Sequence, residues 1–133
     1  MLIIPDKMSA DKVRHLRALG AEIVLTRSDV PKGHPEYYQD MAERMVQEIP
    51  GAFWASQFDN PANPKAHEEG IGPEIWEQTG KSVSHFVTGL GTTGTFVGTS
   101  RYLKEKGVCC ISVQPDNPMH GLEGWKHLDT ALR

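Results

Sequence analysis

Glycine and threonine alternate in one short stretch of the sequence, Gly89-Leu-Gly-Thr-Thr-Gly-Thr95. An apolar run precedes it and residues with helical periodicity follow it, so it is expected to form a strand-to-helix turn. Glycines let the backbone turn tightly and approach an anion closely. The free N–H groups of a helix's first turn bind anions, and threonine hydroxyls add donors at the same place. The residue types therefore predict a phosphate-binding loop.

The same residues leave other interpretations open. No lysine stands in or beside the loop, which excludes a Walker A motif. Gly89, Gly91 and Gly94 satisfy the G-x-G-x-x-G pattern, and Asp116 follows roughly 20 residues later, where a dinucleotide-binding fold places its ribose-binding acid. A Rossmann-type domain of an oxidoreductase is therefore one alternative. A glycine-rich turn that binds nothing is another.

The elements that would position the loop alternate between strand and helix. Strands are expected at residues 2–4, 21–26, 51–58, 85–88 and 108–115, and helices at 9–20, 35–48, 73–80 and from the loop to about 106. The segment DNPANP, residues 59–64, is expected to be a turn or loop because its prolines exclude regular pairing. This order predicts an α/β fold with a mostly parallel sheet. The change of character near 59–64 suggests two half-domains joined there.

Composition narrows the classes of function. The chain has 133 residues and a net charge of −3, without a basic stripe, so no nucleic-acid partner is expected. Its apolar runs are too short to span a bilayer, so no membrane partner is expected. Cys109 and Cys110 are adjacent, which favours reduced thiols in a cytoplasmic protein. Only His120 has a possible metal ligand nearby, Glu123, and the glycines around the pair argue against a metal site.

Three segments occur in a consistent order: MSADKVRHLRALGAEIVLT, SQFDNPANPKAHEEGIGPEIWEQTG and HFVTGLGTTGTFVGTSRYLKE. Together they resemble the fold-type II pyridoxal-phosphate enzymes of the cysteine synthase and cystathionine β-synthase family, including its cysteine synthase B-like branch. The resemblance implies a three-layer, mostly parallel sheet with flanking helices, formed by parts of two half-domains of the tryptophan synthase β-like fold. Residues 1–58 would be the remainder of the first, smaller domain. Residues 59–133 would begin the second, larger domain, which binds the cofactor phosphate.

The resemblance also assigns roles to the glycine loop. The common family loop is Gly-Thr-Gly-Gly-Thr, and the residues in its place, which would hold the phosphate of pyridoxal phosphate, are Gly91, Thr92, Thr93, Gly94 and Thr95. Thr93 stands where the family often has glycine. We therefore expect Gly91 and Gly94 to supply the conformational freedom of the turn.

Two further positions carry weaker implications from the same resemblance. Gln57 corresponds to a glutamine that lines the amino-acid substrate pocket, and Gly121 lies where the family has a mobile loop at the mouth of the active site. The implied reaction is β-replacement on an activated serine, such as O-acetylserine, by a sulfur nucleophile to give cysteine or cystathionine. The implied partners are the amino-acid substrate, the sulfur donor and a second copy of the parent enzyme in a homodimer.

The family's Schiff-base lysine lies in an Asn-Pro-x-Gly-Ser-x-Lys-Asp-Arg context, which does not occur in this sequence. No catalytic residue is therefore assigned, because the lysines present are expected mostly on solvated helices and loops. The chain is expected to be an internal fragment of a cysteine synthase-like enzyme and to be inactive alone. A non-catalytic remnant that binds another chain is a further alternative.

Overall fold

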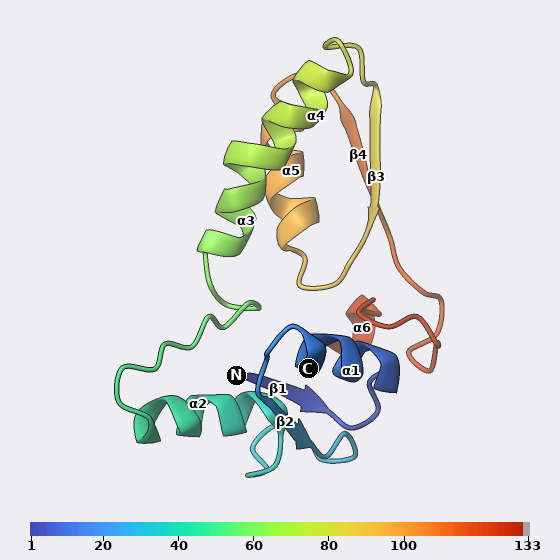
Figure 1. The fold of residues 1–133 in the computed structure, drawn as a ribbon. Coiled ribbons are helices and arrows are strands. Elements are labelled where there is room, and N and C mark those ends of the chain that lie inside the picture. Colours follow the sequence, from blue (N-terminus) through green and yellow to red (C-terminus); the bar gives the residue numbers. More distant parts are fainter. Residues whose placement is uncertain (132–133) are drawn as a thin grey trace. The chain divides into compact units, whose positions relative to one another are not determined.

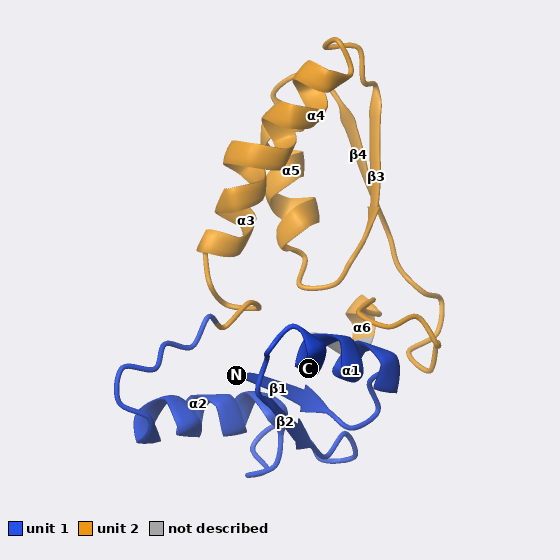
Figure 2. Ribbon diagram, viewed as in Figure 1, with its two compact units in different colours: residues 1–55 blue, residues 56–133 orange. Residues whose placement is uncertain are grey.

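A computed structural model describes residues 1–131 of the protein. The chain forms two compact units, Met1–Ala55 and Ser56–Arg133, which are coloured separately in Figure 2. The assignment of these units to the two expected half-domains, 1–58 and 59–133, stays a prediction.

The first unit is a strand–helix–strand unit followed by a second helix (Figure 1). Its elements are β1 (Leu2–Pro5), α1 (Ala10–Ala18), β2 (Ile23–Thr26) and α2 (Tyr38–Glu48). The two strands pair in parallel, with Leu2 opposite Ile23. Val13 is the buried residue of α1, and Gly20, at φ +86°, ends the turn after that helix.

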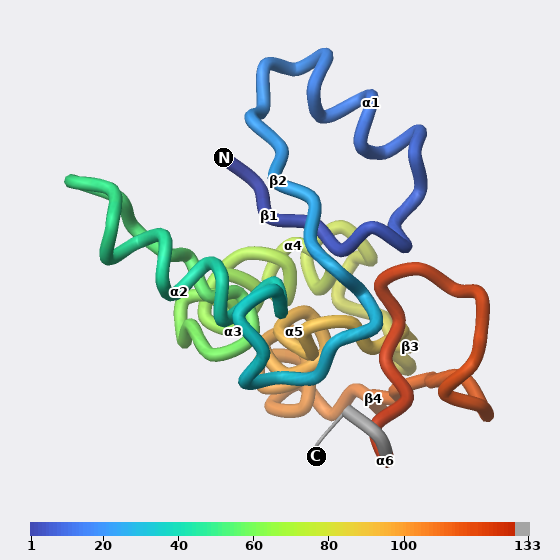
Figure 3. Tube along the Cα trace, turned by 90° about the horizontal axis from the view of Figure 1, so that it is seen from below, coloured from blue at the N-terminus to red at the C-terminus, as the bar shows by residue number. Residues whose placement is uncertain are grey.

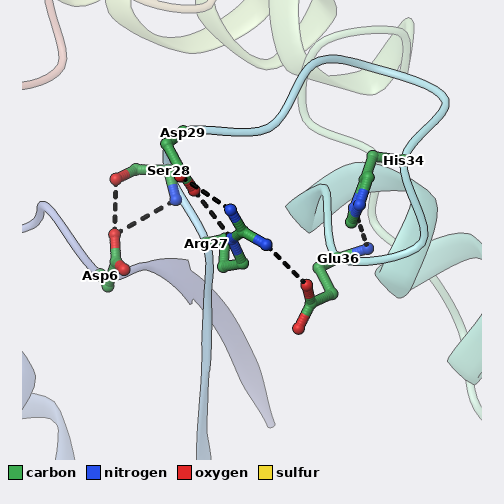
Figure 4. A network of polar contacts seen from close by, with 6 residues as sticks. All are labelled: Asp6, Arg27, Ser28, Asp29, His34 and Glu36. Carbon is green, nitrogen blue, oxygen red and sulfur yellow. Dashed lines mark hydrogen bonds and ion pairs between the residues drawn. The ribbon is translucent and has the colours of Figure 1, made fainter.

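A network of polar side chains fastens the loop that follows β2 (Figure 4). The Ser28 hydroxyl donates to a carboxylate oxygen of Asp6 at 2.5 Å. The Arg27 guanidinium makes two bonds to Asp29, at 2.9 and 2.8 Å, and lies 3.6 Å from Glu36. Its hydrogen bond and charge hold the pKa of the Asp29 carboxyl below its usual range. These groups are exposed, so water and salt screen their contribution to stability.

The second unit has three layers (Figures 1 and 3). Its elements are α3 (Ala62–Ala66), the π-helical segment η1 (His67–Ile71), α4 (Gly72–Gln78), β3 (His85–Gly89), α5 (Gly94–Lys104), β4 (Cys109–Val113) and α6 (Leu128–Ala131). Strands β3 and β4 pair in parallel, and α5 lies between this strand pair and the helix formed by α3, η1 and α4. Among the described residues of the unit, the buried apolar side chains are Leu90, Leu103 and Val108. The layered arrangement places the start of α5 beside α3.

Most of the expected elements are present, with ends that differ by a few residues. Both strand pairs are parallel, as predicted. The prediction of a strand at 51–58 is wrong, because these residues form turns and irregular structure. An apolar run becomes a strand only where it pairs with a neighbouring strand, and the sheets of the described residues are formed by β1 with β2 and by β3 with β4. Phe53 is accordingly exposed and Ser56 has a positive φ of 41°.

The prediction of a loop at 59–64 is wrong for the second half of this segment, because α3 begins at Ala62. The Asn60 side-chain oxygen accepts the N–H of Ala62, the first residue of α3, at 2.9 Å and so satisfies one of the N–H groups that have no intrahelical partner. Pro64 fits into this turn because the first N–H groups of a helix have no intrahelical partner. The helix then continues without a break through η1 into α4. Among the described residues, no helix is long and apolar enough to cross a membrane.

Candidate functional site

The glycine loop connects β3 to α5, as the sequence predicts. Its backbone differs from the expectation in one respect. Thr93, the residue before the helix, takes the left-handed conformation at φ +70° and ψ −12°, whereas Gly91 and Gly94 are absent from the positive-φ residues of the described chain. The expectation that these two glycines supply the conformational freedom is therefore wrong. A β-branched residue at positive φ is strained, and such strain often accompanies functional sites.

The two glycines are required for close contact instead. A Cβ atom on Gly94 would stand 2.1 Å from the side-chain oxygen of Asn63, and one on Gly91 would stand 2.9 Å from the carbonyl oxygen of Gly124. Farther along α5, a Cβ on Gly98 would stand 1.9 Å from the carbonyl oxygen of Pro64. Helix α5 thus lies directly against α3: at Gly94 the Asn63 side chain fills the space, and at Gly98 the backbone of α3 does.

The loop holds hydrogen-bond donors that are not used within the described chain. The hydroxyl oxygen of Thr92 accepts the side-chain N–H of Asn63 at 2.8 Å and, more weakly, the backbone N–H of Gly94 at 3.4 Å. A hydroxyl has two lone pairs and one proton. Because both lone pairs of Thr92 are occupied, its proton is available to an outside acceptor. The first-turn N–H groups of Thr95 and Phe96 likewise bond to no described residue.

Thr95 lies on the exposed side of the same turn. Its hydroxyl lies 3.2 Å from the Nε2 atom of His67, which belongs to the π-helical segment. The Nδ1 atom of the same ring is buried and has no hydrogen-bond partner among the described residues. The hydroxyls of Thr92 and Thr95 are therefore each paired with a residue of the α3–η1 helix.

A cavity of about 130 Å³ adjoins the loop. Thr92, Thr93 and Gly94 line one side of it, and residues 58–61, with Asn63 and Pro64, line the other. Gln57 is exposed, and its backbone carbonyl oxygen accepts the second N–H of the Asn63 amide at 2.8 Å. The structure thus brings the backbone of Gln57 to the glycine loop through Asn63, while its side chain makes no hydrogen bond to the described residues.

The segment 121–126 crosses the other side of the loop. The backbone N–H of Lys126 donates to the carbonyl oxygen of Leu90 at 2.7 Å. A Cβ atom on Gly89 would stand 2.7 Å from the ring of Trp125. Gly121 itself is exposed and has nothing within 4 Å of its Cβ position. The residues of this segment that contact the loop are therefore Gly124, Trp125 and Lys126 rather than Gly121.

Sequence reasoning missed two residues at this site, Asn63 and His67. Their signal was a polar pair four residues apart, which places both side chains on one face of a helix. The signal was hidden because residues 59–64 were expected to be a loop. Of the other positions, Asp116 is exposed in the bend after β4. The described residues contain no group of three His, Cys, Asp or Glu side chains that could hold a metal ion.

Residues 1–130 match the family described as pyridoxal-phosphate dependent enzyme, and the chain belongs to this family. It is 40% identical over 129 residues to cysteine synthase B of Pseudomonas aeruginosa. This match covers 94% of this chain and 42% of that protein. It is 37% identical over 117 residues to the cystathionine beta-synthase of Apis mellifera. This second match covers 86% of this chain and 23% of that protein. The chain spans about two fifths of the length of the first curated relatives.

The fold has a solved counterpart in the O-acetylserine dependent cystathionine beta-synthase from Helicobacter pylori. The TM-score is 0.81 at 33% sequence identity, over 92% of this chain and 42% of that one. This likeness confirms the predicted α/β fold with parallel strands and flanking helices. The family match does not favour the dinucleotide-binding alternative based on the G-x-G-x-x-G pattern.

The loop fits a phosphate group on its own chemistry. Its unused donors, the Thr92 hydroxyl and the first-turn N–H groups, gather where the helix dipole of α5 favours negative charge. A phosphate oxygen is the kind of acceptor that these donors lack. Pyridoxal phosphate, the cofactor that defines the family, carries such a group.

Proposed function

We propose that Gly91–Thr95 binds the phosphate of pyridoxal phosphate in a cysteine synthase-like enzyme. The observation that carries this proposal is the Thr92 hydroxyl, whose lone pairs are occupied and whose proton points to no acceptor in the described chain. Two kinds of donor support it at the start of α5: the first-turn N–H groups and the Thr95 hydroxyl. Binding a phosphate dianion there would satisfy donors that otherwise bond only to water.

The reaction that we propose for the whole enzyme is β-replacement on an activated serine, such as O-acetylserine, by a sulfur nucleophile. Pyridoxal phosphate, when bound, supplies an electron sink for the carbanion that forms at Cα. The contribution of this chain is to anchor the phosphate and so to fix the position of the ring. No lysine of this chain is proposed as the Schiff-base residue.

Gln57 is proposed to contact the amino-acid substrate. Its carbonyl oxygen is fixed by Asn63, the residue that also contacts Thr92, so the substrate position and the phosphate loop share one support. Gly121 is proposed to belong to a segment at the mouth of the site, whose neighbours Gly124 and Trp125 contact the loop. A homodimeric parent and a cytoplasmic location are parts of the same proposal.

The phosphate assignment is tested by comparing pyridoxal phosphate with pyridoxal, which lacks the phosphate. The change Thr92→Val keeps the branched shape and removes the hydroxyl, and Thr95→Val does the same at the other position. A hydrogen bond to a charged group contributes about 1.5–3 kcal/mol, so each change should weaken binding of pyridoxal phosphate by roughly 10-fold or more. Pyridoxal binding should be nearly unaffected, because it makes no contact with these hydroxyls.

Thr79→Val is the matched control, because the Thr79 hydroxyl bonds only to backbone carbonyl oxygens at the end of α4. It should leave both affinities unchanged. Equal losses of pyridoxal and pyridoxal phosphate affinity in the two loop variants would contradict the assignment. Preferential binding of a nicotinamide nucleotide by the unmodified protein would also contradict it.

A further inference from the structure

We propose that Asn63 and His67 are positioning residues that aim the hydroxyls of Thr92 and Thr95 at the cofactor phosphate. The two residues lie four positions apart on one face of the continuous α3–η1 helix. Each is paired with one threonine of the glycine loop. This inference rests on the proposed function, since it concerns how the same phosphate site is held in shape.

Asn63 fixes the direction of the Thr92 proton. One N–H of its amide donates to the Gln57 carbonyl oxygen and the other to the Thr92 hydroxyl oxygen, each at 2.8 Å. An amide that donates to a carbonyl must present its nitrogen there, which determines the orientation of the whole group. Asn63 can therefore only donate to Thr92. The Thr92 hydroxyl accepts this bond and must direct its own proton elsewhere.

His67 fixes the Thr95 proton by a related argument. A proton on the buried Nδ1 atom would be an N–H without an acceptor among the described residues, which costs more than an unpaired lone pair. The proton of the neutral ring therefore belongs on Nε2, which lies 3.2 Å from the Thr95 hydroxyl oxygen. Nε2–H donates, Thr95 accepts, and the Thr95 proton remains for an outside acceptor.

The support for these two contacts is stiff. Gly94 and Gly98 lie on the face of α5 that contacts α3 and η1. A Cβ atom on Gly94 would stand 2.1 Å from Asn63, and one on Gly98 would stand 1.9 Å from Pro64. Helices this close cannot shift relative to each other without a steric clash. The hydroxyls are therefore held in place before any ligand arrives, which lowers the entropic cost of binding.

The test measures the discrimination ratio, the Kd of pyridoxal divided by the Kd of pyridoxal phosphate, for the purified protein and its variants. Asn63→Leu keeps the approximate shape and removes both N–H donors. His67→Leu removes the Nε2 donor, whereas His67→Gln replaces it with an amide nitrogen at a similar position. Lys65→Ala, which removes an exposed side chain of the same helix that pairs with Glu69, is the control.

We expect the ratio to fall by about 5- to 10-fold in Asn63→Leu and His67→Leu, since a misdirected hydroxyl loses most of a charge-assisted hydrogen bond. His67→Gln should recover most of the ratio, and Lys65→Ala should leave it unchanged. The phosphorus NMR resonance of bound pyridoxal phosphate is a second readout that does not depend on activity. It should shift in the two leucine variants and return toward the original position in His67→Gln.

The outcomes separate this inference from the proposed function. A ratio near one in the unmodified protein would refute the phosphate site itself. A high ratio in the unmodified protein that persists in both leucine variants would overturn the positioning role alone. If circular dichroism shows that Asn63→Leu does not fold, the comparison of His67→Leu with His67→Gln decides. Equal ratios in those two variants would then overturn the inference.

Discussion

Replacing Thr93 with glycine should stabilise the protein. Thr93 has a φ of +70° at the start of α5, a conformation in which the Cβ atom of an ordinary residue approaches backbone oxygen. Its carbonyl oxygen accepts the N–H of Val97 at 2.9 Å, a backbone bond that glycine keeps. Its side chain makes no hydrogen bond that caps the helix. The substitution therefore removes strain without removing a side-chain hydrogen bond to the described residues.

The expected gain is the difference between two opposing effects. The left-handed conformation costs about 1–2 kcal/mol for a residue with a Cβ atom, and more for a β-branched one. Glycine in turn gives the unfolded chain additional freedom, which lowers stability by about 0.4–1 kcal/mol. The net increase in the free energy of unfolding should be about 0.5–1 kcal/mol.

Urea unfolding followed by circular dichroism, with linear extrapolation to water, measures this difference. Thr93→Ala is the matched control, since alanine loses the hydroxyl and the branch but keeps the Cβ atom. Its free energy of unfolding should stay within about 0.5 kcal/mol of the original. A Thr93→Gly protein no more stable than Thr93→Ala would refute the reasoning, because the strain would then not depend on Cβ.

Three further predictions concern other parts of the fold. Gly98→Ala should lower the free energy of unfolding by about 1–3 kcal/mol, because the added carbon would clash with backbone of α3; urea unfolding would detect it, and a neutral change would disprove the close helix contact. Gly91→Ala should displace the segment 121–126, so hydrogen exchange at the Lys126 amide, which bonds to the loop, should become faster. An unchanged exchange rate would argue against that contact. Burial raises the pKa of the Tyr38 hydroxyl to about 12. The neutral hydroxyl therefore stabilises the fold fully below pH 10.0, and this contribution is lost as the pH rises through about 12. In an absorbance titration, Tyr38→Phe should lack the step of tyrosinate formation near pH 12.

The sequence was sufficient for elements whose signal is local. The β-branched strands and the helices with apolar periodicity all form, because their own residues favour them and glycine ends several of them. The apolar run at 51–58 does not become a strand, since pairing depends on a neighbour that local sequence does not specify. The missed start of α3 did have a local signal. Asn60 followed by Pro61 is a typical helix beginning, in which proline needs no partner for its missing N–H.

The position of the glycine loop could be predicted, but its internal arrangement could not. Which residue takes the positive φ depends on what the loop must avoid, and here Gly91 and Gly94 are occupied by close contacts with other segments. The partners of Thr92 and Thr95 come from a helix about thirty positions earlier in the chain. Such pairings follow from tertiary packing, so a resemblance in the loop motif alone gives no access to them.

The π-helical segment η1 between α3 and α4 restricts how many residues this region can contain if the fold is to be kept. Before η1, Asn63 contacts the glycine loop; after it, a Cβ atom on Gly72 would stand 2.8 Å from Tyr102, farther along α5. Asn63 also lies against Gly94, the first residue of α5, and Tyr102 belongs to the same helix, so the winding of His67–Ile71 sets the angle between the two contacts. Each residue of an α-helix turns the chain by about 100°. Deleting a single residue from η1 would therefore rotate α4 away from α5 while leaving α3 in place. Homologous chains that keep both contacts should therefore keep the number of residues in this segment, and Glu68, which pairs with Arg101 of α5, adds a constraint on identity.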